Sequence, residues 1–474
     1  MKTLQQHCGR VQEVRSRREL LARAGGGLGM LALPSLLGSS RSSGADELPG
    51  AINPLAARQG HFAARAKAVI WLFMEGAPSA VDMFDPKPEL TRRDGQKIDI
   101  DVFNGNPGPL MKSPFRFERY GETGAWVCEH YTNVAKHVDD FAFIRSCYSE
   151  SNDHVPALYQ INTGIPRPGF PSTGAWVTYG LGSENENLPG FVVLGNNQGV
   201  KGGNLNWSSG FLPSTYQGTL FRPEGNPVIN LSRPQGVSRE DQRAQLDLMT
   251  QLNRRHLEQR PGERELLGRI QSFELAYRMQ MEAMDLVDFS SETAATRKMY
   301  GVDEKETRSF GSKCLMARRL VERGVRFVQV YSDGEWDAHS DLNGNHRGHC
   351  RATDRPVDAL LTDLKQSGLI NDTLVIWGGE FGRMPVSQGN GGRDHNPNGF
   401  GMFMTGAGIR RGVSYGELDE LGFRAAVDRV SVHDLHATIL HLLGIDHEQL
   451  TYFHNGRRFR LTDVAGNVLT PILA

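Results

Sequence analysis

Short apolar runs recur along the chain and end abruptly at glycine, polar or charged residues. Runs of this kind begin at five positions: Val69, Phe141, Val325, Thr373 and Phe400. An apolar run without polar alternation is typical of a strand that is buried on both faces of a sheet. We therefore predict that these runs form the strands of a central β-sheet.

Helical patterns fill most of the intervals between the runs. They predict helices over 315–323, 347–366 and 432–443, and Gly324 and Gly444 are expected to end the first and the last of these. Strands that alternate with helices imply a mostly parallel sheet that is covered on both faces. The predicted fold class is therefore α/β, a doubly wound, mostly parallel sheet with helices on both faces.

Two long segments interrupt this alternation. Residues 146–235 are rich in Gly, Pro, Asn and Ser, and they predict a long irregular insertion that covers one end of the sheet. Residues 238–299 are polar and helical in pattern, with Ser238 as a helix N-cap and a break at Pro261–Gly262. This second segment predicts a helical hairpin.

The first residues have the pattern of an export signal. Ser16-Arg17-Arg18 precedes the uncharged stretch 24–37, as in a twin-arginine signal peptide, although a disordered basic tail is the alternative. We expect residues 1–45 to be such a signal peptide, 46–66 a linker and 67–474 a single domain. The expected partner is then the twin-arginine export machinery, and the expected location is periplasmic or extracellular.

Composition excludes few function classes. The 474 residues carry a formal net charge of -1, with 39% hydrophobic and 23% charged residues, so nothing favours nucleic acid as a partner. No stretch after the leader is long and apolar enough to cross a membrane, so an integral membrane protein is not expected. Of the five cysteines, Cys8 lies in the leader and the other four show no CxxC spacing. Buried free thiols are predicted for these four, with two disulfides as the alternative.

Acidic residues and histidines gather beyond the predicted strands. Five of them stand at or after the end of an apolar run or in the loop beyond it: Glu75, Asp337, His339, Glu380 and His395. Open α/β sheets bind ligands at the carboxyl ends of their strands, where these side chains would meet. Carboxylate and imidazole groups suit a divalent metal such as zinc, manganese, calcium or magnesium. The sequence therefore predicts a metal site built by these five residues.

Four of these residues also have a simpler explanation. Asp337 and His339 fit an Asx-turn with a surface histidine. Glu380 fits an ordinary ion pair with Arg383, and His395 fits the chemistry of a turn. The residues alone leave both interpretations open.

Other histidines are open to interpretation as well. His154, in Asn152-Asp-His-Val-Pro, could be a nucleophile, a general base, a metal ligand or a loop residue at the start of a helix. His346 and His349 lie one turn apart on a predicted helix, and we interpret them as part of a solvated face. His436 accompanies an apolar helical stripe and is expected in the core or on the surface.

The motifs that carry a family resemblance include Leu72-Phe-Met-Glu-Gly-Ala-Pro-Ser79, Phe84-Asp-Pro-Lys-Pro88, Tyr179-Gly-Leu-Gly-Ser-Glu-Asn185, Gly378-Gly-Glu-Phe-Gly-Arg383 and Arg393-Asp-His-Asn-Pro397. They resemble a bacterial sulfatase-like family catalogued as domain of unknown function 1501, within the alkaline phosphatase-like superfamily. The resemblance extends from Ala66 to the C-terminus. It implies a doubly wound α/β sheet and two divalent metals bridged by a nucleophile, in proteins that transfer phosphoryl or sulfuryl groups.

The resemblance also implies roles by position. Glu75 stands where the superfamily has its first-strand metal aspartate, and His395 resembles the late metal histidine. Asp337 and His339 resemble the middle Asp/His pair. The resemblance assigns these four residues to metals, and it puts Glu380 in the place of a fifth acidic position.

Three positions depart from the superfamily pattern. Glu380 takes the place of Asp in the superfamily's Ser-Asp-His-Gly, but Phe381 then stands where a ligating histidine would be. His154 falls where Cys or Ser would be the nucleophile, so no formylglycine can form there. A phosphohistidine intermediate, direct attack by water or loss of catalysis all remain open.

The expected protein is an exported, sulfatase-like, metal-dependent hydrolase of phosphate or sulfate esters, with an anionic small molecule or a polysaccharide ester as substrate. The expected ligands are Asp337, His339 and His395 for one metal, and Glu75 and Glu380 for a second. His154 would be nucleophile or base, and Arg383 would contact the anion through bidentate hydrogen bonds. The alternative is a non-catalytic metal- or ligand-binding envelope protein that retains the fold.

Overall fold

A computed structural model describes residues 54–474, except for 104, 196–198, 234 and 260–263. The predicted signal peptide and the first part of the predicted linker lie outside the described residues. The rest of the predicted linker is tied to the domain by backbone hydrogen bonds from Arg58 to Leu181 and from Arg65 to Leu442.

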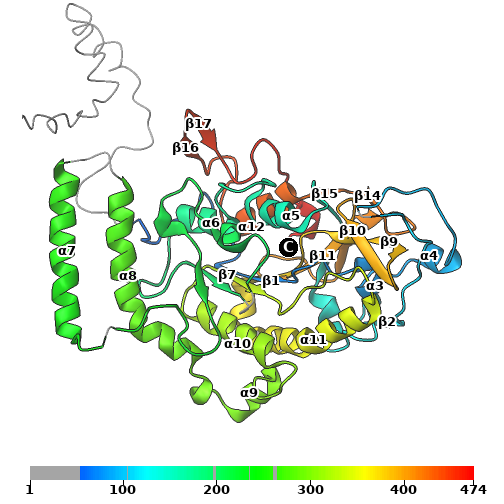
Figure 1. Cartoon of the computed structure of the whole chain (residues 1–474), viewed down its shortest axis with the longest axis horizontal. Coiled ribbons are helices and arrows are strands. Elements are labelled where there is room, and N and C mark those ends of the chain that lie inside the picture. The colour runs from blue at the N-terminus through cyan, green and yellow to red at the C-terminus, as the bar shows by residue number, and fades with distance from the viewer. Residues whose placement is uncertain (1–53, 104, 196–198, 234, 260–263) are drawn as a thin grey trace, which may run out of the picture. The chain divides into compact units, whose positions relative to one another are not determined.

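The five apolar runs lie in the central sheet, which has nine strands in the described part of the chain (Figure 1). Eight strands follow one another in this order: β12 (Val413–Tyr415), β4 (Ala142–Tyr148), β11 (Phe400–Gly406), β8 (Thr373–Gly378), β1 (Ala68–Phe73), β7 (Phe327–Tyr331), β5 (Phe191–Leu194) and β6 (Thr219–Phe221). The ninth, β15 (Val430–Ser431), pairs with β4. All pairings are parallel except those of β11, which runs antiparallel to both β4 and β8. The predicted α/β class with a mostly parallel sheet is confirmed.

The two faces of the sheet carry separate hydrophobic cores, because successive side chains of a strand point to opposite faces. Ile70 and Leu72 of β1 lie in one core, whereas Trp71 and Phe73 lie in the other. The covering helices are α10 (Arg308–Glu322) and α11 (Leu342–Gln366) on the first face, and α5 (His154–Thr163), α6 (Thr173–Leu181) and α12 (Val432–Leu442) on the second (Figure 1). Both faces of β1 are removed from water, which explains its unbroken apolar sequence.

Smaller elements surround this core. The remaining helices are α3 (Ala80–Met83), α4 (Pro88–Arg92), α7 (Arg239–Gln259), α8 (Arg264–Val287) and α9 (Ala294–Tyr300). The two-stranded sheets are β2 (Phe117–Tyr120) with β3 (Ala125–Cys128), β9 (Gly382–Gln388) with β10 (Gly392–Asn396), β13 (Glu417–Leu418) with β14 (Ala425–Val427), and β16 (Tyr452–His454) with β17 (Arg457–Phe459). Helices α7 and α8 lie side by side (Figure 1), so the predicted helical hairpin is confirmed.

Residues 146–235 are more regular than the predicted irregular insertion. Their described part contains α5, α6, β5 and β6, and the two strands extend the central sheet beyond β7. The glycine, proline and asparagine residues occupy the loops between these short elements. Because the elements are short and the loops long, composition concealed the regular structure.

The four cysteines of the described domain are buried and free, as predicted: Cys128, Cys147, Cys314 and Cys350. Among the described helices, none combines the length and the apolar character that a membrane span requires.

His436 on α12 predicts a specific dependence of stability on pH. Its side chain is fully buried, Nε2 lies 2.9 Å from the carbonyl oxygen of Ile161, and burial lowers its pKa to about 3. The unfolded chain therefore binds more protons than the folded one between pH 6.5 and 3, so stability is complete above this range and falls as the pH decreases. We expect the wild type to lose up to about 1.4 kcal/mol per pH unit more than His436→Gln below pH 6.5. Urea unfolding of both proteins at pH 7.5, 6.5 and 5.5 measures this difference, and parallel losses would contradict it.

Candidate metal centre

Several connections of the chain meet at the carboxyl edge of the sheet. Strands β1, β7 and β8 are parallel neighbours, so the segments that follow them emerge at the same edge. The candidate residues come from these segments and from two neighbours: Glu75 after β1, Asp337 and His339 between β7 and α11, Glu380 after β8, His395 in β10 and His154 at the start of α5.

The turn after β1 lets two of these segments approach closely. Gly76 has a positive φ of 96°, and a Cβ atom there would lie 2.6 Å from the backbone nitrogen of Trp336 and 2.7 Å from that of Asp337. The backbone N–H of Trp336 donates a hydrogen bond of 2.8 Å to the carbonyl oxygen of Glu75. Only glycine leaves room for this contact, which fixes the Asp337 loop against the end of β1.

The carboxylate of Asp337 is the centre of the cluster. Its Oδ1 lies 3.0 Å from Nε2 of His339 and 3.3 Å from Nε2 of His395. Its Oδ2 lies 3.1 Å from Nε2 of His154. Two overlapping groups of possible metal ligands result: His154, Asp337 and His395, and His339, Asp394 and His395. The structure thus brings together predicted residues that are far apart in the sequence.

Hydrogen bonds outside the cluster fix the tautomers of two imidazoles. Nδ1 of His395 lies 2.6 Å from the carbonyl oxygen of Asn152, and Nδ1 of His339 lies 2.5 Å from the side-chain oxygen of Gln388. Because these oxygens accept hydrogen bonds, a proton belongs on each Nδ1, and each Nε2 is left to face Asp337. The two Nε2 atoms are only 2.9 Å apart. A positive charge is needed among these atoms, and either an additional proton or a metal cation supplies it.

Glu380 holds the third imidazole in the same way. Its Oε1 lies 2.6 Å from Nδ1 of His154 and accepts a 3.0 Å hydrogen bond from the backbone N–H of Gly76. Among the described residues its buried Oε2 has no hydrogen-bond partner, an unfavourable state for a carboxylate oxygen. Glu380 therefore orients His154 and keeps one oxygen for a further ligand.

Phe381 packs against two imidazoles of the cluster. Its ring centroid lies 4.8 Å from those of both His154 and His395. The phenylalanine therefore acts as an apolar wall that holds the two imidazoles in place.

Glu75 lies beside the cluster and binds a different segment. Its Oε1 accepts a 2.7 Å hydrogen bond from the backbone N–H of Lys201. The Nζ atom of the same lysine lies 2.8 Å from Glu335 and 3.3 Å from Oδ2 of Asp337. Glu75 thus places Lys201 at the cluster through the backbone of the lysine.

Arg383 is fully occupied by protein acceptors. Its side chain has no exposed surface, and it donates to Oδ1 of Asp337 at 2.7 Å, to the carbonyl oxygen of Ala77 at 3.0 Å and to that of Gly76. The predicted ion pair partner of Glu380 is therefore bound to Asp337 instead. A contact between Arg383 and an anion would require it to give up these partners.

Attraction within the cluster outweighs the effect of burial on the pKa of Asp337 and of His154, whereas burial prevails for Glu75 and His395. Burial would raise the pKa of Asp337, but the imidazoles and Arg383 hold it far below its usual value. Burial would lower the pKa of His154, but hydrogen bonds to Asp337 and Glu380 raise it to about 9. For Glu75, burial is the main cause and raises the pKa to about 7. The centre therefore concentrates charge in a site with little access to water.

The solvated face predicted for His346 and His349 is wrong. His346 is fully buried, its Nε2 accepts a 3.0 Å hydrogen bond from the backbone N–H of Ser79, and burial lowers its pKa to about 3. His349 donates from Nε2 to the carbonyl oxygen of Glu335 at 2.7 Å, and its ring stacks on Trp336 at 5.0 Å. The first turns of α11 pack against the loop that carries Asp337, so both histidines support that loop.

A buried ion pair lies beneath β10. Arg393 contacts Asp82 through Nε at 2.7 Å and through a terminal nitrogen at 3.2 Å, and neither side chain is exposed. The next residue, Asp394, accepts a 2.9 Å hydrogen bond from the backbone N–H of His395. The ion pair therefore ties the strand that carries His395 to α3, where Asp82 lies.

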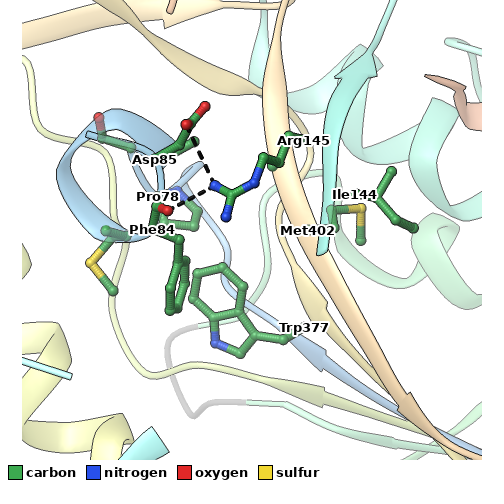
Figure 2. Close-up of a pocket in the computed structure, with 11 residues that line it drawn as sticks. Pro78, Phe84, Asp85, Ile144, Arg145, Trp377 and Met402 are labelled. Carbon is green, nitrogen blue, oxygen red and sulfur yellow. Dashed lines mark hydrogen bonds and ion pairs between the residues drawn. The ribbon is translucent and has the colours of Figure 1, made fainter. Parts of the chain in front are cut away.

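Cavities also lie away from the metal centre. One, of about 20 Å³, lies between the Pro78–Asp85 segment and strands β4, β8 and β11 (Figure 2). Figure 2 shows Arg145 at its mouth, where it donates to the carbonyl oxygen of Phe84 at 2.8 Å and lies 3.5 Å from Asp85. Another, of about 580 Å³, lies between β6, α6 and α8. The small cavity has room for about one water molecule, so it is a packing feature rather than a substrate site.

Sequence reasoning missed Lys201, Asn152 and Gln388 as members or supports of the centre. Asn152 acts through its backbone oxygen and Gln388 through a strand that the sequence did not predict, so neither left a signal. Lys201 stands between Gly199 and the pair Gly202-Gly203, all with positive φ. A lysine between such glycines was the one sequence feature that could have indicated a functional role for Lys201.

The sequence profile of a family described as "Protein of unknown function (DUF1501)" matches residues 66–473. No curated protein sequence is similar to the chain. Among solved structures, a lipoteichoic acid synthase from Listeria monocytogenes is 10% identical, with 86% of this chain and 78% of that one covered and a TM-score of 0.38. The alkaline phosphatase from the Antarctic bacterium TAB5 is 9% identical, with 80% and 98% covered and a TM-score of 0.35. A sulfatase from Pseudoalteromonas sp. is 13% identical, with 80% and 68% covered and a TM-score of 0.34. Likeness at this level identifies no shared reaction.

Proposed function

The chain belongs to the family of proteins of unknown function DUF1501, and from this premise we propose that it is an exported, metal-dependent hydrolase of phosphate or sulfate esters. One observation carries the proposal. The imidazoles of His154, His339 and His395 all turn Nε2 toward Asp337, while each Nδ1 is held by an oxygen outside. This pattern is characteristic of metal-binding histidines, whose second nitrogen donates to a carboxylate or carbonyl group.

The donor set fits a divalent transition metal. Asp337, His339 and His395 offer one carboxylate and two imidazole nitrogens at mutual distances of 2.9 to 3.3 Å. Imidazole nitrogen favours zinc or manganese, whereas magnesium and calcium prefer all-oxygen sites. When bound, such a cation would polarise the phosphoryl or sulfuryl group of an ester.

His154 is suited to proton transfer beside that site. Glu380 fixes its ring through Nδ1, as a carboxylate orients a catalytic histidine, and leaves Nε2 directed at Asp337. We assign His154 the role of proton acceptor or donor to the reacting group. Its first position in α5 also places it at the positive end of a helix.

Lys201 is the group that we assign to the anion. Its side chain is partly exposed and its Nζ is already at Asp337, whereas the Arg383 side chain is inaccessible. We therefore assign to Lys201 the contact with the anion that the sequence predicted for Arg383. Arg383 instead holds Asp337 in position.

A second cation between Glu75 and Glu380 remains part of the proposal. Its support is the unpartnered Oε2 of Glu380 within the described chain and the raised pKa of Glu75, for which the charge of Glu380 is one cause. The signal peptide over residues 1–45, the twin-arginine machinery as partner and an anionic or polysaccharide ester as substrate are proposed on the sequence patterns.

Metal analysis and generic ester assays test the proposed function. Protein recovered from its native export route should hold at least one zinc or manganese ion per chain and hydrolyse an aryl phosphate or an aryl sulfate. His154→Gln should keep the metal and lose turnover, which would separate proton transfer from metal binding. A chain that binds no divalent metal and turns over neither ester would instead favour a non-catalytic binding protein.

Substitution of Lys201 should weaken binding of the anionic ester. Because a charge-assisted hydrogen bond contributes about 1.5–3 kcal/mol, Lys201→Met should lower kcat/KM for the aryl ester roughly tenfold to a hundredfold. Lys201→Arg should recover part of the loss. Lys67→Met removes an exposed lysine just before β1, at the opposite edge of the sheet, and should leave kcat/KM unchanged. Equal kinetics for Lys201→Met and wild type would rule out the assigned contact.

A further inference from the structure

Helix α7 exposes apolar side chains of the kind that a helix in a globular protein normally buries. Leu248 is 57% exposed, Leu252 is 56% exposed and Met249 is 39% exposed. None of the described side chains of α7 is buried, and none belongs to a hydrophobic core of the domain. Helices are stabilised mainly by packing an apolar face against other elements. Within the described chain, the apolar face of α7 is therefore left without the contact that usually stabilises a helix.

The side of α7 that meets α8 is polar instead. Arg243 forms an ion pair with Glu274 at 2.6 Å, and its guanidinium lies 5.1 Å from the ring centre of Tyr277. Arg239 donates a hydrogen bond of 3.4 Å to the hydroxyl of Tyr277. Figure 1 shows α7 on the side of α8 that faces away from the central sheet. The helix thus turns a polar face to its neighbour and apolar side chains to solvent, the reverse of the usual arrangement.

The outward face of α7 forms one continuous stripe. Residues three, four and seven positions apart lie on the same side of a helix. By this spacing, the exposed leucines line up with an acidic residue near the start of α7 and a basic residue near its end. All members of this set are exposed. We call the set the outer stripe, and its members are Asp241, Ala244, Gln245, Leu248, Leu252 and Arg255.

The outer stripe is complementary to itself in the antiparallel direction. When a second copy of α7 lies antiparallel across a two-fold axis at Leu248, Asp241 of each copy faces Arg255 of the other, and Ala244 faces Leu252. Opposite charges then meet at both ends, and a small residue faces a large one on each side of the axis. A parallel arrangement would place acid against acid and base against base. The sequence of the stripe therefore favours the antiparallel arrangement.

A hollow beside the outer stripe provides room for this contact. It has a volume of about 420 Å³ and lies between Val237 and the first half of the stripe, where Asp241, Ala244 and Leu248 line it. In the antiparallel arrangement, Leu252 of the second copy is the side chain that faces Ala244 and so reaches this hollow. Large side chains that fill spaces beside small ones are the basis of close packing between helices.

We propose that α7 joins two copies of this chain into an antiparallel, two-fold symmetric dimer. The sequence of α7 has four basic and four acidic residues, so its charge gives no preference for an anionic membrane or polymer. An unrelated protein partner would not require a stripe that matches itself. The inference does not depend on the proposed hydrolase activity.

The size of the outer stripe sets the expected affinity. A helix of 21 residues presents a face about 30 Å long and about 10 Å wide. This area is smaller than the roughly 800 Å² that each partner contributes to a standard interface. We therefore expect a reversible dimer with a Kd in the micromolar range.

Sedimentation velocity of the full chain tests the proposal. The wild type should change from monomer to dimer as its concentration rises through the micromolar range. Leu248→Glu places two like charges at the two-fold axis and should raise the Kd at least about 100-fold. Glutamate and leucine have similar helix propensities, so below the Kd this variant should unfold at the same urea concentration as the wild type. Phe453→Glu is the matched control, because Phe453 is similarly exposed, at 63%, on β16, and it should dimerise as the wild type does.

Two charge variants test the antiparallel register. Asp241→Arg and Arg255→Glu each bring like charges together at both ends of the helix pair, so each alone should raise the Kd about tenfold. An equimolar mixture of the two variants restores both opposite-charge pairs and should dimerise as tightly as the wild type. In a parallel pair of helices, neither variant alone would change the number of like-charge contacts.

Three results would overturn the proposal. The first is a wild type that stays monomeric well above the micromolar range, and the second is a dimer that Leu248→Glu leaves intact. The third is a dimer that both charge variants form as tightly as the wild type, because the ends of α7 would then not face each other. A monomer whose binding to lipid vesicles is lost in Leu248→Glu would overturn it in favour of a membrane surface.

Discussion

Asp337→Asn is expected to abolish metal retention and ester hydrolysis together. The substitution removes the negative charge to which His154, His339 and His395 all turn. Loss of a group that merely orients a ligand lowers metal affinity by about 10- to 100-fold, so loss of the shared carboxylate should exceed about 100-fold. Elemental analysis after dialysis and kcat/KM on an aryl phosphate and an aryl sulfate measure the two effects.

Stability needs its own control in this experiment, because Asp337→Asn also deprives the buried Arg383 of a carboxylate. His339→Gln supplies it. The His339 side chain is 35% exposed, so its replacement should cost little stability while it removes a ligand. The proposal predicts that His339→Gln unfolds at the same urea concentration as the wild type in the absence of metal, yet holds less metal. Full metal content in both variants would show that the ion lies elsewhere.

Asp82→Ala is expected to destabilise the protein by about 3–5 kcal/mol, the largest effect on stability that we predict. The substitution leaves the fully buried guanidinium of Arg393 without its carboxylate, which now lies 2.7 Å from Nε. Equilibrium urea unfolding measures the loss. Because Arg393 precedes His395 by two residues in β10, metal affinity should fall as well.

An exposed pair provides the comparison. Asp94 lies 3.4 Å from Lys112, and both side chains are accessible to water. Asp94→Ala should therefore change stability by about 1 kcal/mol or less. If the two alanine variants unfold at similar urea concentrations, burial is not what makes the Asp82–Arg393 pair important. A stability loss for Asp82→Ala with unchanged metal content would mean that β10 keeps its position without the pair.

The strands of the sheet could be predicted because each one carries its own signal. The run from Val69 is apolar on both faces, and burial on both faces is what the two cores of the structure require. The approach of Asp337 to His395 could be predicted for a related reason, since the segments that follow neighbouring parallel strands emerge at the same edge of the sheet. Chemistry at strand ends is therefore accessible to sequence reasoning even when the partners are distant along the chain.

Other contacts had no local signal. Strand β5 is only four residues long and lies among glycine-rich loops, so it was interpreted as part of an irregular segment. The contact of Glu380 with His154 depends on where the start of α5 meets the end of β8, which is a property of the packed fold. His346 shows the same limit, because a helix face becomes buried or solvated according to what packs on it.

The antiparallel direction of strand β11 affects how the metal centre could diversify. Because β11 is antiparallel to β8, the connection between them begins and ends at the same edge of the sheet. This connection, residues 379–399, therefore lies at one edge of the sheet. It supplies Glu380, Arg383, Arg393 and His395. Lengthening or shortening this connection would change the residues that form and support the metal centre while leaving the strands of the central sheet in register.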